Sequence, residues 1–193
     1  WSRTQSAIGE DVLGRIQSTR VAIVGCGRLG SRLAEDLVFG FGLKDIILLD
    51  GDRLEHSNKG EVSTLLVNGD VGEHKVDVLA RSLQQEAPWA RPEPRSIMLT
   101  PGESEAIDAI RTADLLFCAT DTLPSRLVAG WIATSMGIPH FDLGVGALRE
   151  RGRRDDLVIG ADCRLVVGTD EPRCVLCFGG GLGGAATLQE ALQ

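Results

Sequence analysis

The chain has 193 residues, of which 43% are hydrophobic and 24% are charged, a composition typical of a folded globular protein. Its formal net charge of −7 argues against a nucleic-acid-binding surface, because contacts to phosphate need clustered Lys and Arg. No stretch approaches the roughly 18 apolar residues of a membrane-spanning helix, so neither nucleic acid nor a membrane is expected as a partner.

The cysteines and the chain ends set further expectations. Five cysteines, an odd number, are more typical of a reducing compartment than of a disulfide scaffold, and no signal peptide precedes Trp1, so we expect a cytoplasmic protein. This length predicts a single domain over residues 1–193. Because the chain starts with Trp1 and stops soon after a glycine run at 179–184, we expect the domain to be incomplete at its C-terminal end.

The first predicted elements form a nucleotide-binding unit. They are a helix over 2–17, a strand over 20–25, a helix over 28–38 and a strand over 45–50. Gly25, Gly27 and Gly30 join the first strand to the second helix, and Asp50 ends the second strand. Such glycines let the backbone approach a phosphate at the helix N-terminus, and the acid accepts a hydrogen bond from a ribose. The alternative, glycines that serve only a tight turn, fits this context less well.

Strands and helices continue to alternate. Asp70 and Glu73 form a D-x-x-E capping box that predicts a helix running to about residue 85. Its inward face should carry Val76, Leu79, Ala80 and Leu83. After a turn-rich connector at 88–94 we expect strands over 95–99, 114–119 and 139–143, a helix over 104–112, and a helix beginning near Pro124 and packed by Leu127, Trp131 and Ile132.

The pattern changes after residue 143, where antiparallel strands are expected over 156–159 and 163–167 without a helix between them. The basic run at 149–154 is typical of a solvated hairpin loop. The fold class is therefore predicted to be α/β, a Rossmann-like, doubly wound and mostly parallel sheet with helices on both faces and an antiparallel C-terminal extension.

Polar residues follow the strands at the edge where open α/β sheets bind ligands. Asp50 and Asp52 follow the second strand, with Asn58 close behind, and Asp121 follows the fourth. Lys75 stands near the start of the helix after Asp70. Together they provide an acid for a ribose, a cation for phosphate and a second acid suited to Mg²⁺, whereas a dehydrogenase has no use for that lysine or second acid.

Four motifs in this order resemble one known family. They are DGDRLEHSN at 50–58, DVGEHK at 70–75, ATDTLPSR at 119–126 and PRCVLC at 172–177, after an opening helix at 2–17. Over nearly its whole length the chain resembles the ubiquitin-activating-enzyme-like superfamily of ThiF, MoeB and HesA proteins. The resemblance implies ATP-dependent adenylation of the C-terminal carboxylate of a small ubiquitin-like or sulfur-carrier protein ending in Gly-Gly, which releases pyrophosphate.

The resemblance also implies a role for each site residue. By position, Asp50 would hold the ribose, Asn58 and Lys75 the phosphates, and Asp121 the Mg²⁺. Arg3 would reach the triphosphate of the partner subunit in a homodimer. The remaining nucleotide-binding positions would be Gly25, Gly27, Arg28, Gly30 and Asp52. Two of these residues have a plain alternative: Asp121 as the cap of the helix at Pro124, and Lys75 as a solvated lysine.

The chain departs from the family pattern in two places. The family usually has an Arg shortly after the Ser-Asn pair, but here Lys59 follows Asn58, and a lysine does not reproduce a bidentate guanidinium. Arg28 replaces a residue that is usually small, so it either reaches phosphate or covers the helix.

The cysteine pattern is the second departure. Cys174 and Cys177 match the first half of a structural zinc site. Such a site needs four ligands, so the sequence leaves open whether Zn²⁺ is bound. Cys26, Cys118 and Cys163 are interpreted as small core residues. No cysteine follows Cys177 to accept an acyl group.

Three functions compete. Asp50, Lys75 and Asp121 favour an adenylating enzyme. The missing arginine and acyl-accepting cysteine favour a catalytically impaired partner subunit of a heterodimeric activator. An NAD-dependent oxidoreductase ranks last, because it leaves Lys75 and the Cys174–Cys177 pair without a role.

Overall fold

A six-stranded sheet organises the chain. The computed structural model describes residues 1–58, 66, 69–149 and 157–167. The strands are β1 (Arg20–Val24), β2 (Asp45–Leu49), β3 (Arg91–Arg95), β4 (Leu115–Cys118), β5 (His140–Arg149) and β6 (Leu157–Val166). Their order is β3-β2-β1-β4-β5-β6, with β6 antiparallel to β5 and every other pair parallel. The predicted fold class, Rossmann-like with an antiparallel extension, is confirmed.

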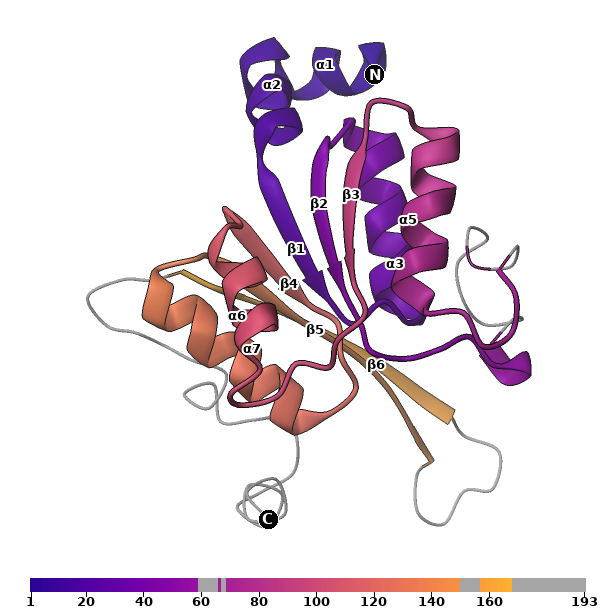
Figure 1. Cartoon of the computed structure of the whole chain (residues 1–193). Helices are drawn as coiled ribbons and strands as arrows, with labels where there is room; N and C mark the ends of the chain where they lie inside the picture. The colour runs from indigo at the N-terminus through magenta and orange to yellow at the C-terminus, as the bar shows by residue number, and fades with distance from the viewer. Residues whose placement is uncertain (59–65, 67–68, 150–156, 168–193) are drawn as a thin grey trace.

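Helices cover both faces of this sheet (Figure 1). Those described are α1 (Ser2–Ile8), α2 (Glu10–Ser18), α3 (Arg28–Glu35), η1 (Asp36–Gly40), η2 (His56–Asn58), α5 (Lys75–Glu86), α6 (Ser104–Arg111) and α7 (Leu123–Met136). Helices α3 and α5 lie on one face, and α6 and α7 lie on the other. The short helices α1 and α2 stand beyond the amino ends of the strands, at the top of Figure 1.

Two apolar clusters fill the space between sheet and helices. Alternate residues of a strand enter opposite clusters: Ile23 packs on the α3 and α5 side, whereas Ala22 and Val24 pack on the α6 and α7 side. The predicted inward face of α5 is confirmed, because Val76, Leu79, Ala80 and Leu83 are all buried. Full burial of each large aliphatic side chain contributes about 1.5–3 kcal/mol, so these clusters fix how the helices lie on the sheet.

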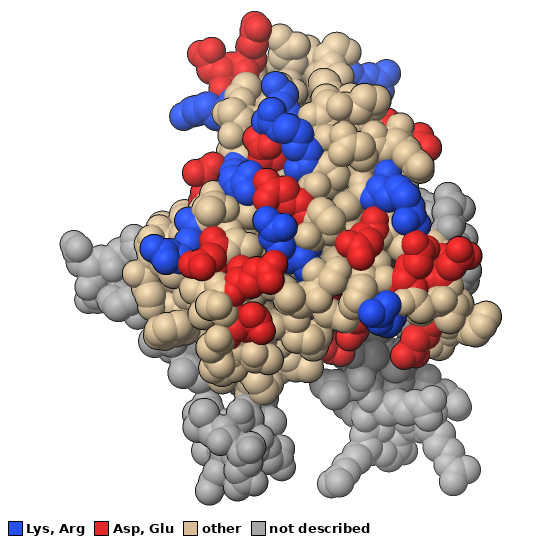
Figure 2. Space-filling model, in the orientation of Figure 1, with Lys and Arg blue, Asp and Glu red and all other residues tan. Residues whose placement is uncertain are grey.

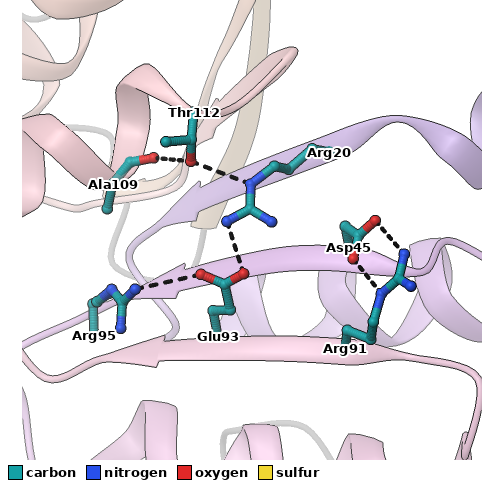
Figure 3. A network of polar contacts seen from close by, with 7 residues as sticks. All are labelled: Arg20, Asp45, Arg91, Glu93, Arg95, Ala109 and Thr112. Carbon is teal, nitrogen blue, oxygen red and sulfur yellow. Dashed lines mark hydrogen bonds and ion pairs between the residues drawn. The ribbon is translucent and has the colours of Figure 1, made fainter.

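The third strand lies earlier than the sequence indicated. The prediction of a strand at 95–99 after a connector at 88–94 is wrong, because Arg91–Arg95 forms β3 at the sheet edge. The Arg91 N–H bonds Lys44 O at 2.6 Å, which turns Pro92 and Pro94 away from β2. Prolines are tolerated there because their missing N–H groups face outward. Figure 3 shows Arg91 of β3 paired with Asp45, and Glu93 of β3 paired with Arg20.

Two predicted helices differ from the structure because a glycine with positive φ interrupts each of them. The helix predicted over 2–17 is broken at Gly9, where φ is 87°. The capping box at Asp70 closes a turn instead of starting a helix: the Asp70 N–H bonds Glu73 Oε2 at 2.7 Å, but Gly72 has φ of 97°. Helix α5 begins only at Lys75, after His74 has formed a β-bridge with Arg53.

The remaining differences concern the second half of the chain. The two strands expected over 156–159 and 163–167 are one strand, β6, paired along the whole of β5. Trp131 is 64% exposed, so its predicted packing against the sheet is wrong, whereas Ile132 is buried. The expected hairpin loop falls mostly outside the described residues.

No helix among the described residues is long and apolar enough to cross a bilayer. On the face drawn in Figure 2, basic and acidic side chains are interspersed.

Candidate functional site

A cavity of about 970 Å³ opens at the carboxyl ends of the parallel strands. It lies between the glycine loop, the start of α5, the start of α7 and the β5–β6 pair. Its wall includes most of the residues singled out from the sequence, namely Gly25, Gly27, Arg28, Asp50, Asp52, Lys75 and Asp121. The structure therefore brings together residues from four separate segments of the chain.

Two glycines are sterically required beside this cavity. Gly25 has φ of +88°, and a Cβ there would lie 2.9 Å from the backbone of Ala119 at the end of β4. A Cβ on Gly30 would lie 1.8 Å from the carbonyl oxygen of Gly25. Gly30 does not line the cavity; it lets α3 approach the end of β1. The helix N-terminus thereby stays open to an anion.

The carboxylate of Asp50 is held by two backbone amides. Its Oδ2 accepts a hydrogen bond from Cys26 N at 2.7 Å, and its Oδ1 accepts one from Asp52 N at 2.8 Å. Burial raises the pKa of Asp50, and these two amide hydrogen bonds counter that rise. Because each carboxylate oxygen has two lone-pair sites, Asp50 keeps acceptor capacity for hydroxyl groups of a ligand.

Lys75 is the first residue of α5 and its side chain enters the cavity wall. It is 8% exposed, and its Nζ lies 2.8 Å from Asp52 Oδ2. The interpretation of Lys75 as a solvated lysine is therefore wrong. An ammonium group has three donors, so the pair with Asp52 leaves two for a phosphate.

Asp121 lies beyond β4, exposed and in the wall of the cavity. The cap residue of α7 is Thr122, whose Oγ1 bonds Ser125 Oγ at 2.9 Å. Asp121 is thus not the cap of this helix, which was the alternative to a metal-binding role. Mg²⁺ is typically held by one or two carboxylates together with substrate phosphates and waters, and an exposed carboxylate beside the glycine loop fits that requirement.

The described structure does not place the other predicted site residues in the cavity wall. Arg3 is exposed on α1, at the opposite end of the sheet (Figure 1). Asn58 ends η2, and its side chain lies outside what the structure describes. Cys174 and Cys177 lie outside the described residues, and the described part of the chain holds no group of three or more metal-ligating side chains. Cys163 is exposed, so its interpretation as a core residue is wrong, whereas Cys26 and Cys118 are buried.

Sequence reasoning gave no role to two arginines in the wall. Arg32 lines the cavity one helical turn after Arg28. Arg126 is 6% exposed and forms a bidentate pair with Asp142, with N–O distances of 2.7 and 2.5 Å. The spacing of Arg28 and Arg32 at i and i+4 was the only available signal for the first; no local pattern signals the second, because Asp142 lies on β5.

The chain is similar in sequence to known adenylyltransferases. The chain is 31% identical over 132 residues to a sulfur carrier protein adenylyltransferase of Thermus thermophilus, covering 68% of this chain and 47% of that protein. It is 33% identical over 139 residues to the adenylyltransferase and sulfurtransferase uba4 of Aspergillus clavatus, covering 72% of this chain and 27% of that protein. The chain thus spans less than half the length of these relatives.

A solved structure shows the same fold. The E. coli tRNA N6-threonylcarbamoyladenosine dehydratase TcdA superposes with a TM-score of 0.68 at 22% identity, covering 78% of this chain and 60% of that one. The model of the ThiF family matches residues 2–184. The resemblance seen in the four sequence motifs is confirmed, and the chain belongs to the ThiF family.

Proposed function

We propose that this chain is an adenylation domain, which uses ATP to activate the C-terminal carboxylate of a small ubiquitin-like or sulfur-carrier protein ending in Gly-Gly. The observation that carries the proposal is the meeting of Asp50, Lys75 and Asp121 with the glycine loop around one cavity. A ribose acceptor, a phosphate cation and a metal-binding carboxylate are the parts that a Mg²⁺-bound triphosphate needs.

In the proposed reaction the carboxylate of the small protein attacks the α-phosphorus of ATP, and pyrophosphate leaves. Asp50 accepts hydrogen bonds from the ribose and so fixes the nucleoside. Amides of the glycine loop and Lys75 bind the phosphates, which lowers the charge that opposes an incoming carboxylate. Asp121 holds Mg²⁺, which stabilises charge on the phosphate oxygens.

Relatives favour this function over the impaired partner subunit. The Thermus protein is named for activity on a sulfur carrier protein, and both relatives carry adenylyltransferase in their names. This chain keeps each of the three polar side chains that the chemistry needs. The oxidoreductase alternative leaves Lys75 and Asp121 without a role.

A homodimer would explain how Arg3 can act in catalysis although it lies away from the cavity of its own chain. Helix α1 buries none of its own residues, and Trp1 before α1, Ile8 on α1 and Val12 on α2 are exposed. Arg3 lies on α1, at the end of the sheet opposite the cavity of its own chain (Figure 1). We therefore propose that it serves the site of a second copy, so that dimerisation and activity are coupled. Sedimentation together with activity of Arg3→Ala tests this; a fully active monomer would exclude it.

ATP–pyrophosphate exchange tests the proposed function. The purified chain is incubated with Mg²⁺, ATP and labelled pyrophosphate, and each small Gly-Gly-ending protein encoded near its gene is added in turn. We expect label to enter ATP with one of them, and not with the same protein lacking its last two glycines. Exchange with none of them would count against adenylation of such a partner.

A further inference from the structure

The cavity wall carries equal numbers of basic and acidic side chains. Its ionisable side chains are Arg28, Arg32, Lys75 and Arg126 against Asp50, Asp52, Asp121 and Asp162. ATP brings about four negative charges, and one Mg²⁺ offsets only two of them. A triphosphate in this cavity therefore needs a basic side chain that no carboxylate of the protein already neutralises.

Two of the four basic groups are engaged by carboxylates. Lys75 Nζ contacts Asp52 at 2.8 Å, and the Arg126 guanidinium is bound by both oxygens of Asp142. A cation held in a bidentate pair in a buried place gives up that pair only at high cost. Arg126 is therefore a structural link between α7 and β5, and its charge is already neutralised by Asp142.

Arg32 differs from Lys75 and Arg126 in its surroundings. It lines the cavity, its side chain is exposed, and its guanidinium makes no hydrogen bond or ion pair with any residue that the structure describes. The sheet-facing residues of α3, including Ser31 and Ala34, are buried, so Arg32 lies on the other side of the helix. Helical side chains lean toward the helix N-terminus, which brings the guanidinium back over the first turn toward the glycine loop.

Asp50 and the glycine loop indicate which part of the nucleotide Arg32 would contact. Asp50 holds the ribose in the proposed function, and its carboxylate is bonded to Cys26 of the glycine loop. The α-phosphate would then lie against the loop, and the outer phosphates would extend beyond it toward the surface of α3 that carries Arg32. A guanidinium matches two phosphate oxygens at once, which a lysine does not.

We propose that Arg32 binds the β- and γ-phosphates of ATP and thereby distinguishes the triphosphate from a monophosphate. This inference rests on the proposed function, because it takes ATP as the ligand. On pyrophosphate departure, the same guanidinium neutralises charge that builds on the leaving group.

Isothermal titration calorimetry of the full chain with Mg-ATP and with AMP tests the proposed role of Arg32. Arg32→Ala should weaken Mg-ATP binding by about tenfold or more, the effect of losing charge-assisted hydrogen bonds, and should change AMP binding by less than about twofold. Arg32→Lys should fall between that variant and wild type. Arg15→Ala, an exposed helical arginine outside the cavity, is the matched control and should bind both ligands as wild type does.

The outcomes separate the two proposals. If the wild-type chain binds neither nucleotide, both the proposed function and this inference fail. If it binds Mg-ATP and Arg32→Ala binds equally well, the inference is wrong and the function stands. Equal weakening of AMP and Mg-ATP would also overturn it, because the contact would then not be to the outer phosphates. Thermal unfolding of Arg32→Ala should match wild type, since the side chain is exposed.

Discussion

Lys75 and Asp52 are joined twice. The Lys75 Nζ contacts Asp52 Oδ2 at 2.8 Å, and the Lys75 backbone N–H donates to Asp52 O at 3.0 Å. A lysine at the first position of a helix is electrostatically unfavourable, because the helix N-terminus carries partial positive charge. Asp52 offsets that cost and holds the ammonium in the cavity wall. A locally unfavourable residue kept in place by a partner is typical of a functional site.

We predict that Asp52→Asn lowers the rate of ATP–pyrophosphate exchange by about fivefold to tenfold, because Lys75 loses its orientation but keeps its charge. Lys75→Ala should lower the rate by about a hundredfold or more, because the charge itself is gone. Both variants should unfold close to the wild-type temperature, since Asp52 is 58% exposed and such a pair adds little stability. An Asp52→Asn enzyme as slow as Lys75→Ala would mean that Asp52 itself contacts the substrate.

Asp121→Ala should abolish exchange while the fold stays intact. The side chain is exposed and does not cap α7, so its loss removes the proposed Mg²⁺ ligand and little else. Exchange rate and circular dichroism are measured together. Asp108→Ala is the control, because Asp108 is an exposed acid on α6 outside the cavity. Near-wild-type exchange by Asp121→Ala would remove it from the site.

Among the ion pairs of the described residues, Arg126 and Asp142 should contribute most to stability. Asp142→Asn leaves a buried guanidinium without its counter-charge, and we expect it to lower the free energy of unfolding by about 3 kcal/mol or more. Asp45→Asn breaks a bidentate pair of similar geometry with Arg91, which is 66% exposed, and should cost less than about 1 kcal/mol. Urea denaturation of both variants is the measurement. Equal losses would contradict the buried role of Asp142.

Cysteine reactivity should follow burial. Burial, with a further contribution from Asp50, raises the pKa of the Cys26 thiol well above its usual value, and burial also raises the pKa of Cys118. At pH 8 both should stay protonated and react slowly with iodoacetamide, because only the thiolate is nucleophilic. The exposed Cys163 should be labelled before either of these two. Peptide mass spectrometry at timed intervals resolves each site; rapid labelling of Cys26 in the folded chain would contradict its burial.

Much of the sheet could be predicted from the sequence. Strands β1, β2 and β4 are buried on both faces and appear as continuous apolar runs, so their predicted bounds agree with the structure to within one residue. Strand β3 could not be recognised in the same way. It is an edge strand, and Pro92 and Pro94 made it resemble a turn.

The site was predictable where its residues follow strands and not where it depends on pairing across the fold. The glycine loop and Asp50 stand next to apolar runs that show where each strand ends. The contacts of Asp52 with Lys75 and of Arg126 with Asp142 join separate segments, and no local spacing encodes them. The proposed role of Arg32 depends on the cavity, whose wall includes this residue.

The choice of nucleotide is the most direct test of the whole account. Thermal-shift titration compares Mg-ATP with NAD on the wild-type chain, because a ligand that binds the native state raises the melting temperature by mass action. We predict a rise that saturates with Mg-ATP, none with NAD, and a much smaller rise for Asp50→Ala with Mg-ATP. Stabilisation by NAD without stabilisation by Mg-ATP would contradict the adenylation function and favour the NAD-dependent oxidoreductase.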